Sequence, residues 1–63
     1  MTVADLEELA ADLYRRAGDA ELLAPSYKHE PDAARARGKA FAYRHAGDMV
    51  VHLARLASEE REP

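Results

Sequence analysis

The apolar residues of the N-terminal segment recur with a helical period. Placed at 100° per residue they fill an arc of about 140°, and they are Val3, Leu6, Leu9, Ala10, Leu13, Tyr14 and Ala17. Thr2 and Asp5 have the spacing of a capping box, in which hydroxyl and carboxylate each accept the other residue's amide. The pattern predicts a helix over about residues 2–17. Gly18 can end it in the left-handed conformation, or the helix can extend to about residue 24.

Two prolines bound the segment that follows. Pro25 and Pro31 resist helix continuation, which predicts a loop over about residues 25–31. Pro31 suits the first turn of a new helix, and Asp32 adds a favourable negative charge there. The helical pattern then continues, predicting a second helix over about residues 32–60 with a length of about 40 Å.

The second helix is apolar around most of its circumference. Its apolar and small residues sweep about 220°, against about 100° for a helix buried on one side, so it needs two packing partners. The first helix supplies one, and a second molecule supplies the other. The sequence thus predicts an all-α protein, a two-helix antiparallel hairpin that self-associates into a four-helix bundle. The expected interface between copies is Ala42, Tyr43, Ala46, Gly47, Val50, Leu53 and Ala54.

Composition narrows the possible functions. The 63 residues form one small domain, and with no cysteine they have no disulfide, thiol nucleophile or cysteine-ligated zinc. Alanine supplies 14 residues, whereas leucine, valine and phenylalanine together supply 11, so a thick core is not expected. The longest apolar run, at residues 40–43, is far too short to span a bilayer. We expect no membrane contact, no cofactor and a cytoplasmic location.

One group of residues has metal-ligand spacing. His45, Asp48 and His52 are three and four residues apart, which places them on one helical face within reach of a single ion. A metal-binding helical oligomer is therefore an alternative function. The simpler interpretation is that Asp48 forms solvated ion pairs with Arg44 or Arg55 at helical spacings.

Charge is unevenly distributed along the chain. Residues 1–24 carry a net charge of −4, residues 25–44 carry +3 and residues 45–63 carry −2. A nucleic-acid-associated bundle is a further alternative, although the chain as a whole is acidic. That function would use the basic residues Arg35, Arg37, Lys39 and Arg44.

Phe41 is the one large apolar residue on the polar side of the second helix. With Arg37 and Arg44 it forms a candidate docking site for a partner protein. His29 has no evident partner nucleophile, so we expect no enzymatic activity. Residues 38–46 resemble helices of small bacterial and phage proteins, which suggests a phage or prophage origin and implies no activity. The sequence favours a small interaction or regulatory protein that assembles with itself.

Overall fold

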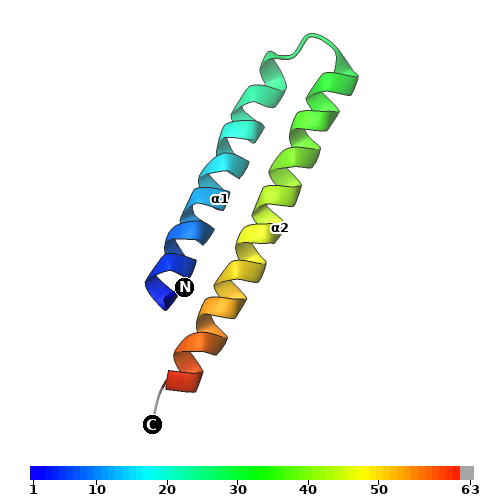
Figure 1. The fold of residues 1–63 in the computed structure, drawn as a ribbon. Helices are drawn as coiled ribbons and strands as arrows, with labels where there is room; N and C mark the ends of the chain where they lie inside the picture. Colours follow the sequence, from blue (N-terminus) through cyan, green and yellow to red (C-terminus); the bar gives the residue numbers. More distant parts are fainter. Residues whose placement is uncertain (62–63) are drawn as a thin grey trace.

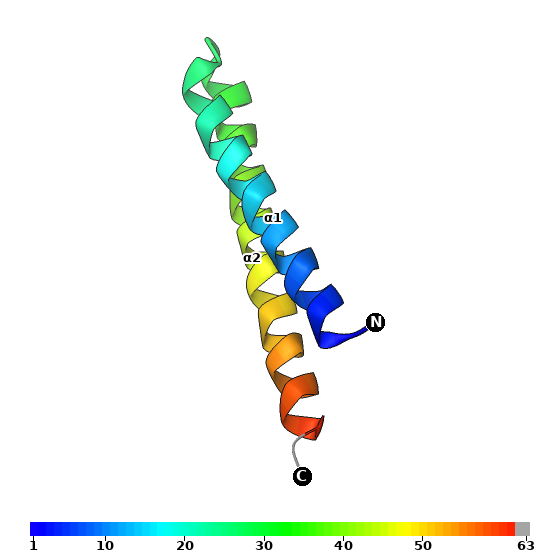
Figure 2. The same ribbon diagram turned by 90° about the vertical axis from the view of Figure 1, so that its left-hand side faces the viewer.

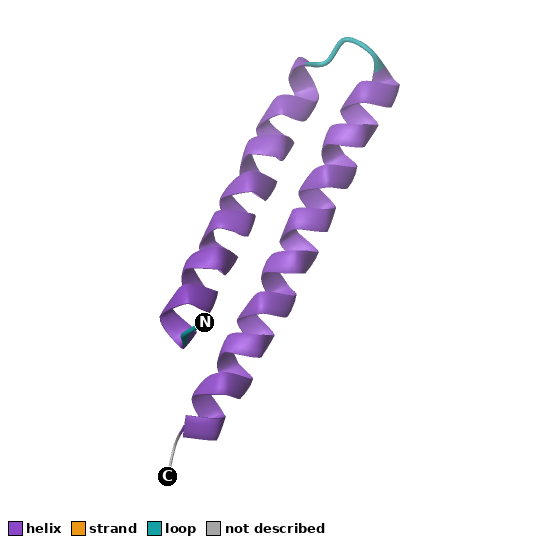
Figure 3. Cartoon of the chain, viewed as in Figure 1, coloured by secondary structure: helices purple, strands orange, loops and turns teal. Residues whose placement is uncertain are grey.

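Two antiparallel helices joined by a short turn make up the protein. The computed structural model describes residues 1–61. Helix α1 spans Val3–Leu23, a single 3-10 turn spans Ala24–Ser26, and helix α2 spans Glu30–Arg61. The start of α1 and the end of α2 lie at the same end of the hairpin, where α2 extends beyond the start of α1 (Figure 1). The predicted all-α hairpin with a long second helix is confirmed (Figure 3).

The two ends of α1 follow from local hydrogen bonding. The Thr2 amide donates to Asp5 Oδ2 at 2.9 Å, and the Asp5 amide donates to Thr2 Oγ1 at 3.1 Å, which is the predicted capping box. These bonds lower the pKa of the Asp5 carboxyl, the bond from the Thr2 backbone contributing most. Gly18 does not end the helix, since it has no left-handed backbone. The helix ends before Pro25, which has no amide hydrogen to donate.

The turn is held by short-range bonds to the backbone. Ser26 Oγ donates a hydrogen bond to the Leu23 carbonyl oxygen at 2.6 Å. The Tyr27 amide donates one to the Ala24 carbonyl oxygen at 3.3 Å. The His29 carbonyl oxygen then accepts from the amides of Asp32 and Ala33, both at 3.1 Å, and so starts α2. The second helix begins at Glu30, two residues earlier than predicted, with Pro31 in its first turn as expected.

A seam of small residues, one every seven positions on each helix, joins the two helices. We call it the small-residue seam. It consists of Ala10, Ala17 and Ala24 on α1 and Ala33, Ala40, Gly47 and Ala54 on α2, all of which are buried. Because alanine and glycine have little or no side chain, the two backbones can approach closely along the hairpin. The larger residues beside it, such as Leu13 and Val50, are only half-buried.

Gly47 is the tightest point of the seam. A Cβ atom at this position would lie 2.9 Å from Cε1 of the Tyr14 ring and 3.1 Å from its Cζ. The ring therefore lies directly on the glycine backbone. Gly18 and Gly38 differ, since a Cβ atom at either would meet nothing within 4 Å.

The molecule is a rod. Its Cα atoms extend over 54 × 13 × 13 Å, and two views at right angles agree that the helices lie side by side (Figures 1 and 2). The radius of gyration is 14.9 Å, against about 11 Å for a compact domain of this length. A rod of two helices leaves most of each helix surface uncovered.

We expect alanine substitutions at the three glycines to have different effects on stability. Gly18→Ala and Gly38→Ala should each raise the free energy of unfolding by about 1 kcal/mol, because alanine is the better helix former and the space is open. Gly47→Ala should leave the free energy of unfolding unchanged or lower it, because the new methyl group displaces the Tyr14 ring. Urea unfolding at one fixed protein concentration measures all three. An equal gain at all three positions would contradict the packing of Tyr14 on Gly47.

Candidate interaction surface

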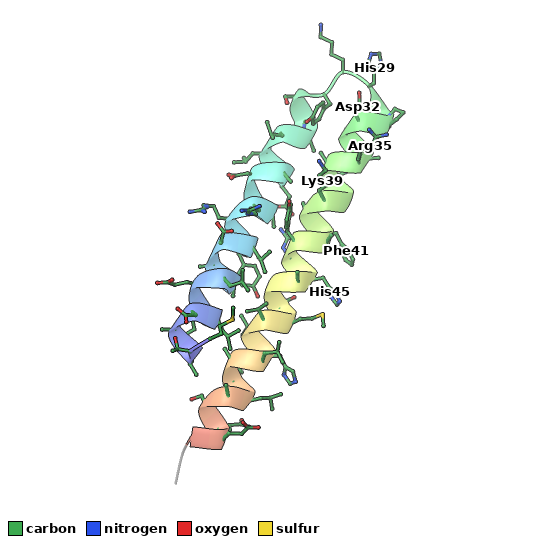
Figure 4. All side chains as sticks on the ribbon, in the orientation of Figure 1. His29, Asp32, Arg35, Lys39, Phe41 and His45 are labelled. Carbon is green, nitrogen blue, oxygen red and sulfur yellow. The ribbon has the colours of Figure 1, made fainter. Side chains whose placement is uncertain are left out.

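The polar side of α2 is open to solvent, as predicted. Phe41 projects from it with 71% of its surface exposed. Its ring stacks on that of His45, with the ring planes 2° from parallel and the centroids 6.4 Å apart. Figure 4 shows both side chains on the outer side of α2, away from α1. Phe41 therefore takes no part in joining the helices.

The structure does not bring together the side chains of the expected metal ligands, His45, Asp48 and His52. The Asp48 carboxylate accepts a hydrogen bond from the Tyr14 hydroxyl at 2.5 Å, while His45 stacks on Phe41. Over residues 1–61 no three histidine, aspartate or glutamate side chains are placed to share an ion. Helical spacing places the three residues on one face of α2. Asp48 contacts Tyr14 of α1, however, and His45 contacts Phe41.

The three residues of the predicted docking site do come together. Arg37, Phe41 and Arg44 line one hollow with Pro25 at the loop end. Both guanidinium groups are in ion pairs there, Arg37 with Glu30 and Arg44 with Glu21. The hollow is therefore apolar at its centre and nearly neutral around its rim.

The four basic residues expected to bind nucleic acid do not form one patch. Arg35 and Lys39 line a different hollow, beside Tyr27 and Asp32, while Arg37 and Arg44 line the one next to Phe41. The α2 helix thus presents its cations in two separate directions. Such a split does not build the continuous basic surface on which nucleic-acid binding usually depends.

A second apolar surface runs along α2, beside the seam. We call it the outer stripe, and it consists of Ala42, Ala46, Met49, Leu53 and Leu56, at spacings of three and four residues. Met49 is 58% exposed, Leu53 52% and Leu56 43%. Leu9 of α1, itself 39% exposed, occupies the equivalent heptad position on the same side of the hairpin. This is the largest set of uncovered apolar side chains on α2.

The expected interface between copies only partly coincides with this stripe. Gly47 and Ala54 are buried inside the hairpin, and Tyr43 and Val50 are half-buried beside them. Gly47 and Ala54 therefore lie in the contact with α1, while a role of Tyr43 and Val50 in an interface between copies stays a prediction. Ala42, Ala46 and Leu53 remain in the stripe, and the prediction omitted its other large members, Met49 and Leu56. The apolar spacing of three and four residues from position 42 to position 56 already indicates both of these residues in the sequence.

The exposed area of the chain is large for its mass. The accessible surface is 4939 Å², whereas a folded monomer of 7.0 kDa has about 4,000 Å². Across residues 1–60, the buried apolar side chains are all alanines, and no larger side chain is fully buried. The excess of exposed surface, which includes the side chains of the outer stripe, is the feature of this chain that most favours a partner.

Comparison with known proteins does not assign a family. No protein-family model matches the chain, and no curated protein or solved structure is significantly similar to it. Within residues 1–61, neither helix combines the length and the apolar composition that crossing a bilayer requires. Function is therefore inferred from the chain's own surface.

The hydrogen bond from Tyr14 to Asp48 predicts a pH dependence. Chiefly because the phenol donates to this carboxylate, the pKa of Tyr14 is raised above its usual value of about 10. The stabilisation is therefore complete below about pH 10 and is lost as the pH rises through the folded-state pKa. Wild-type stability should fall more steeply above pH 10 than that of Tyr14→Phe.

Chemical unfolding across an alkaline pH series measures this difference. Tyr27→Phe is the matched control, because Tyr27 lies in the turn and its loss should leave the steep alkaline fall unchanged. Asp48→Asn should lower the pKa of Tyr14 in a phenolate absorbance titration. An unchanged titration curve in that variant would show that the bond does not form in solution.

Proposed function

We propose that this chain is a small non-enzymatic interaction protein that acts as a homodimer. Two hairpins pack through their outer stripes to form a four-helix bundle. The exposure of Met49, Leu53 and Leu56 along one line of α2 is the observation that supports this most directly. Leucine and methionine side chains repeated at three- and four-residue spacing are typical of a helix packed against another helix.

The exposed area is of the right size for such an interface. The chain exposes 4939 Å², about 900 Å² more than expected for its mass. A typical stable interface buries about 800 Å² on each partner. Packing two outer stripes together would bring the exposed area per chain to the level of an ordinary folded protein.

The composition of the core supports the same proposal. A buried alanine removes only a methyl group from water, so a core of alanines such as Ala17 and Ala40 contributes little hydrophobic free energy. The leucines that would contribute more lie outside the hairpin core. Folding of the hairpin is then strengthened by assembly, and its stability rises with protein concentration.

A charged residue in the stripe should separate the copies. We expect the wild-type protein to sediment at about twice its 7.0 kDa mass and its thermal midpoint to rise with concentration. Leu53→Lys should weaken association by roughly tenfold or more, because it places an unpaired ammonium group in an apolar contact. Analytical ultracentrifugation with circular dichroism over a dilution series measures both effects.

Leu22→Lys is the matched control for this experiment. Leu22 is 79% exposed on α1, at a heptad position away from the stripe, so the same substitution there should leave the dimer intact. Phe41→Ser should also leave both dimerisation and stability unchanged, because Phe41 is 71% exposed and is not part of the outer stripe. A wild-type monomer that melts cooperatively at a concentration-independent midpoint would refute the proposal.

A further inference from the structure

The outer stripe is graded in size along α2. The half nearer the turn holds the small residues Ala42 and Ala46, and the half nearer the C-terminal end holds Leu53 and Leu56. Met49 stands at the centre, seven residues from Ala42 and seven from Leu56. One half of the stripe is therefore shallow and the other half protrudes.

We propose that the two copies pack α2 against α2 in antiparallel orientation, with the two-fold axis at Met49. This inference rests on the proposed homodimer and specifies how its copies meet. The axis places Ala42 of one copy opposite Leu56 of the other, and Ala46 next to Leu53 with an offset of one residue. Each protruding residue then enters the space above an alanine, which is how side chains interlock between packed helices.

A parallel arrangement would lack this fit. It would set Leu56 against Leu56 and Ala42 against Ala42, which crowds one end of the contact and leaves a gap at the other. Packed interfaces match the density of protein interiors and tolerate neither defect well. The size gradient thus favours one orientation of the second copy.

The charges that flank the stripe favour the same orientation. Lys39 lies seven residues before Ala46, and Glu60 lies seven residues after Leu53, so both occupy the same heptad position. The antiparallel pairing sets Lys39 of one copy next to Glu60 of the other, with an offset of one residue, twice per dimer. A parallel pairing would set lysine against lysine and glutamate against glutamate. Among residues 1–61, neither Lys39 nor Glu60 is in an ion pair of its own chain.

Helix α1 does not offer a competing surface. The positions on α1 that correspond to the outer stripe include two leucines, Leu9 and, at the turn end of the helix, Leu23. The others there are mostly charged: Asp5, Asp12, Arg16 and Asp19. Asp12 is already engaged by both Arg15 and Arg16. The contact between copies is therefore centred on α2, with Leu9 at its edge.

Disulfide cross-linking tests the orientation directly, because the chain has no cysteine of its own. Ala42→Cys and Leu56→Cys are made as separate variants, and sedimentation of each in reduced form first verifies that it dimerises. Mixed and oxidised, they should form a cross-linked heterodimer. Each variant alone should not cross-link, because two copies of residue 56 would lie about 21 Å apart along the helix axis, beyond the roughly 7 Å Cα separation of a disulfide.

The outcomes separate the two proposals. Cross-linking of Leu56→Cys with itself, and none in the mixture, would overturn the antiparallel arrangement while leaving self-association in place. A chain that stays monomeric at every concentration would remove both proposals.

A charge exchange provides a second test that needs no oxidation. Lys39→Glu should weaken association by about three- to tenfold, and adding Glu60→Lys to the same chain should restore it. A parallel dimer would respond differently, since Lys39→Glu only replaces one like-charged pair by another. No rescue in the double variant would therefore contradict the pairing of residues 39 and 60.

Discussion

The close contact between the two helices along the small-residue seam determines how the rest of the molecule is arranged. Alanine or glycine at every seventh position lets the backbones approach, but it leaves no room between them for a leucine. The large apolar residues of α2, such as Met49 and Leu53, therefore lie to one side. A hairpin joined in this way has a narrow interior and an apolar exterior face.

The seam side and the outer side of α2 therefore have different roles. The seam side, where Gly47 accepts the Tyr14 ring, fixes the register of the hairpin. The bond from Tyr14 to Asp48 adds a polar contact at the same level of the rod. The large side chains of the outer stripe stay about half exposed in the hairpin, which is why assembly and folding are expected to depend on each other.

Much of the fold could be predicted from local signals. The capping box at Thr2 and the prolines at positions 25 and 31 act within one turn of helix, so they can be interpreted without knowing the tertiary structure. The wide apolar arc of α2 likewise predicted its contact with α1, while the second packing partner that the arc indicates stays a prediction. Phe41 fell on the polar side of that arc, and it is exposed as expected.

What could not be predicted depends on contacts between the helices. A glycine such as Gly18 commonly ends a helix. The small-residue seam continues past it to Ala24, however, and packing against α2 keeps this part of the chain helical. Asp48 has the spacing of a metal ligand, yet its partner, Tyr14, is on the other helix. The sequence places Gly47 and Ala54 in a contact between copies, because the apolar character of a residue does not indicate which neighbour it faces.

The seven-residue spacing of the seam also has a consequence for shape. Seven residues of a straight α-helix make slightly less than two turns, falling about 20° short, so a strict heptad seam makes the two helices coil around each other with a left hand. The outer stripe repeats with the same interval at residues 42, 49 and 56, and it must follow the same gentle spiral. Any protein that docks along its whole length therefore has to share that curvature, which a second copy of this chain does automatically.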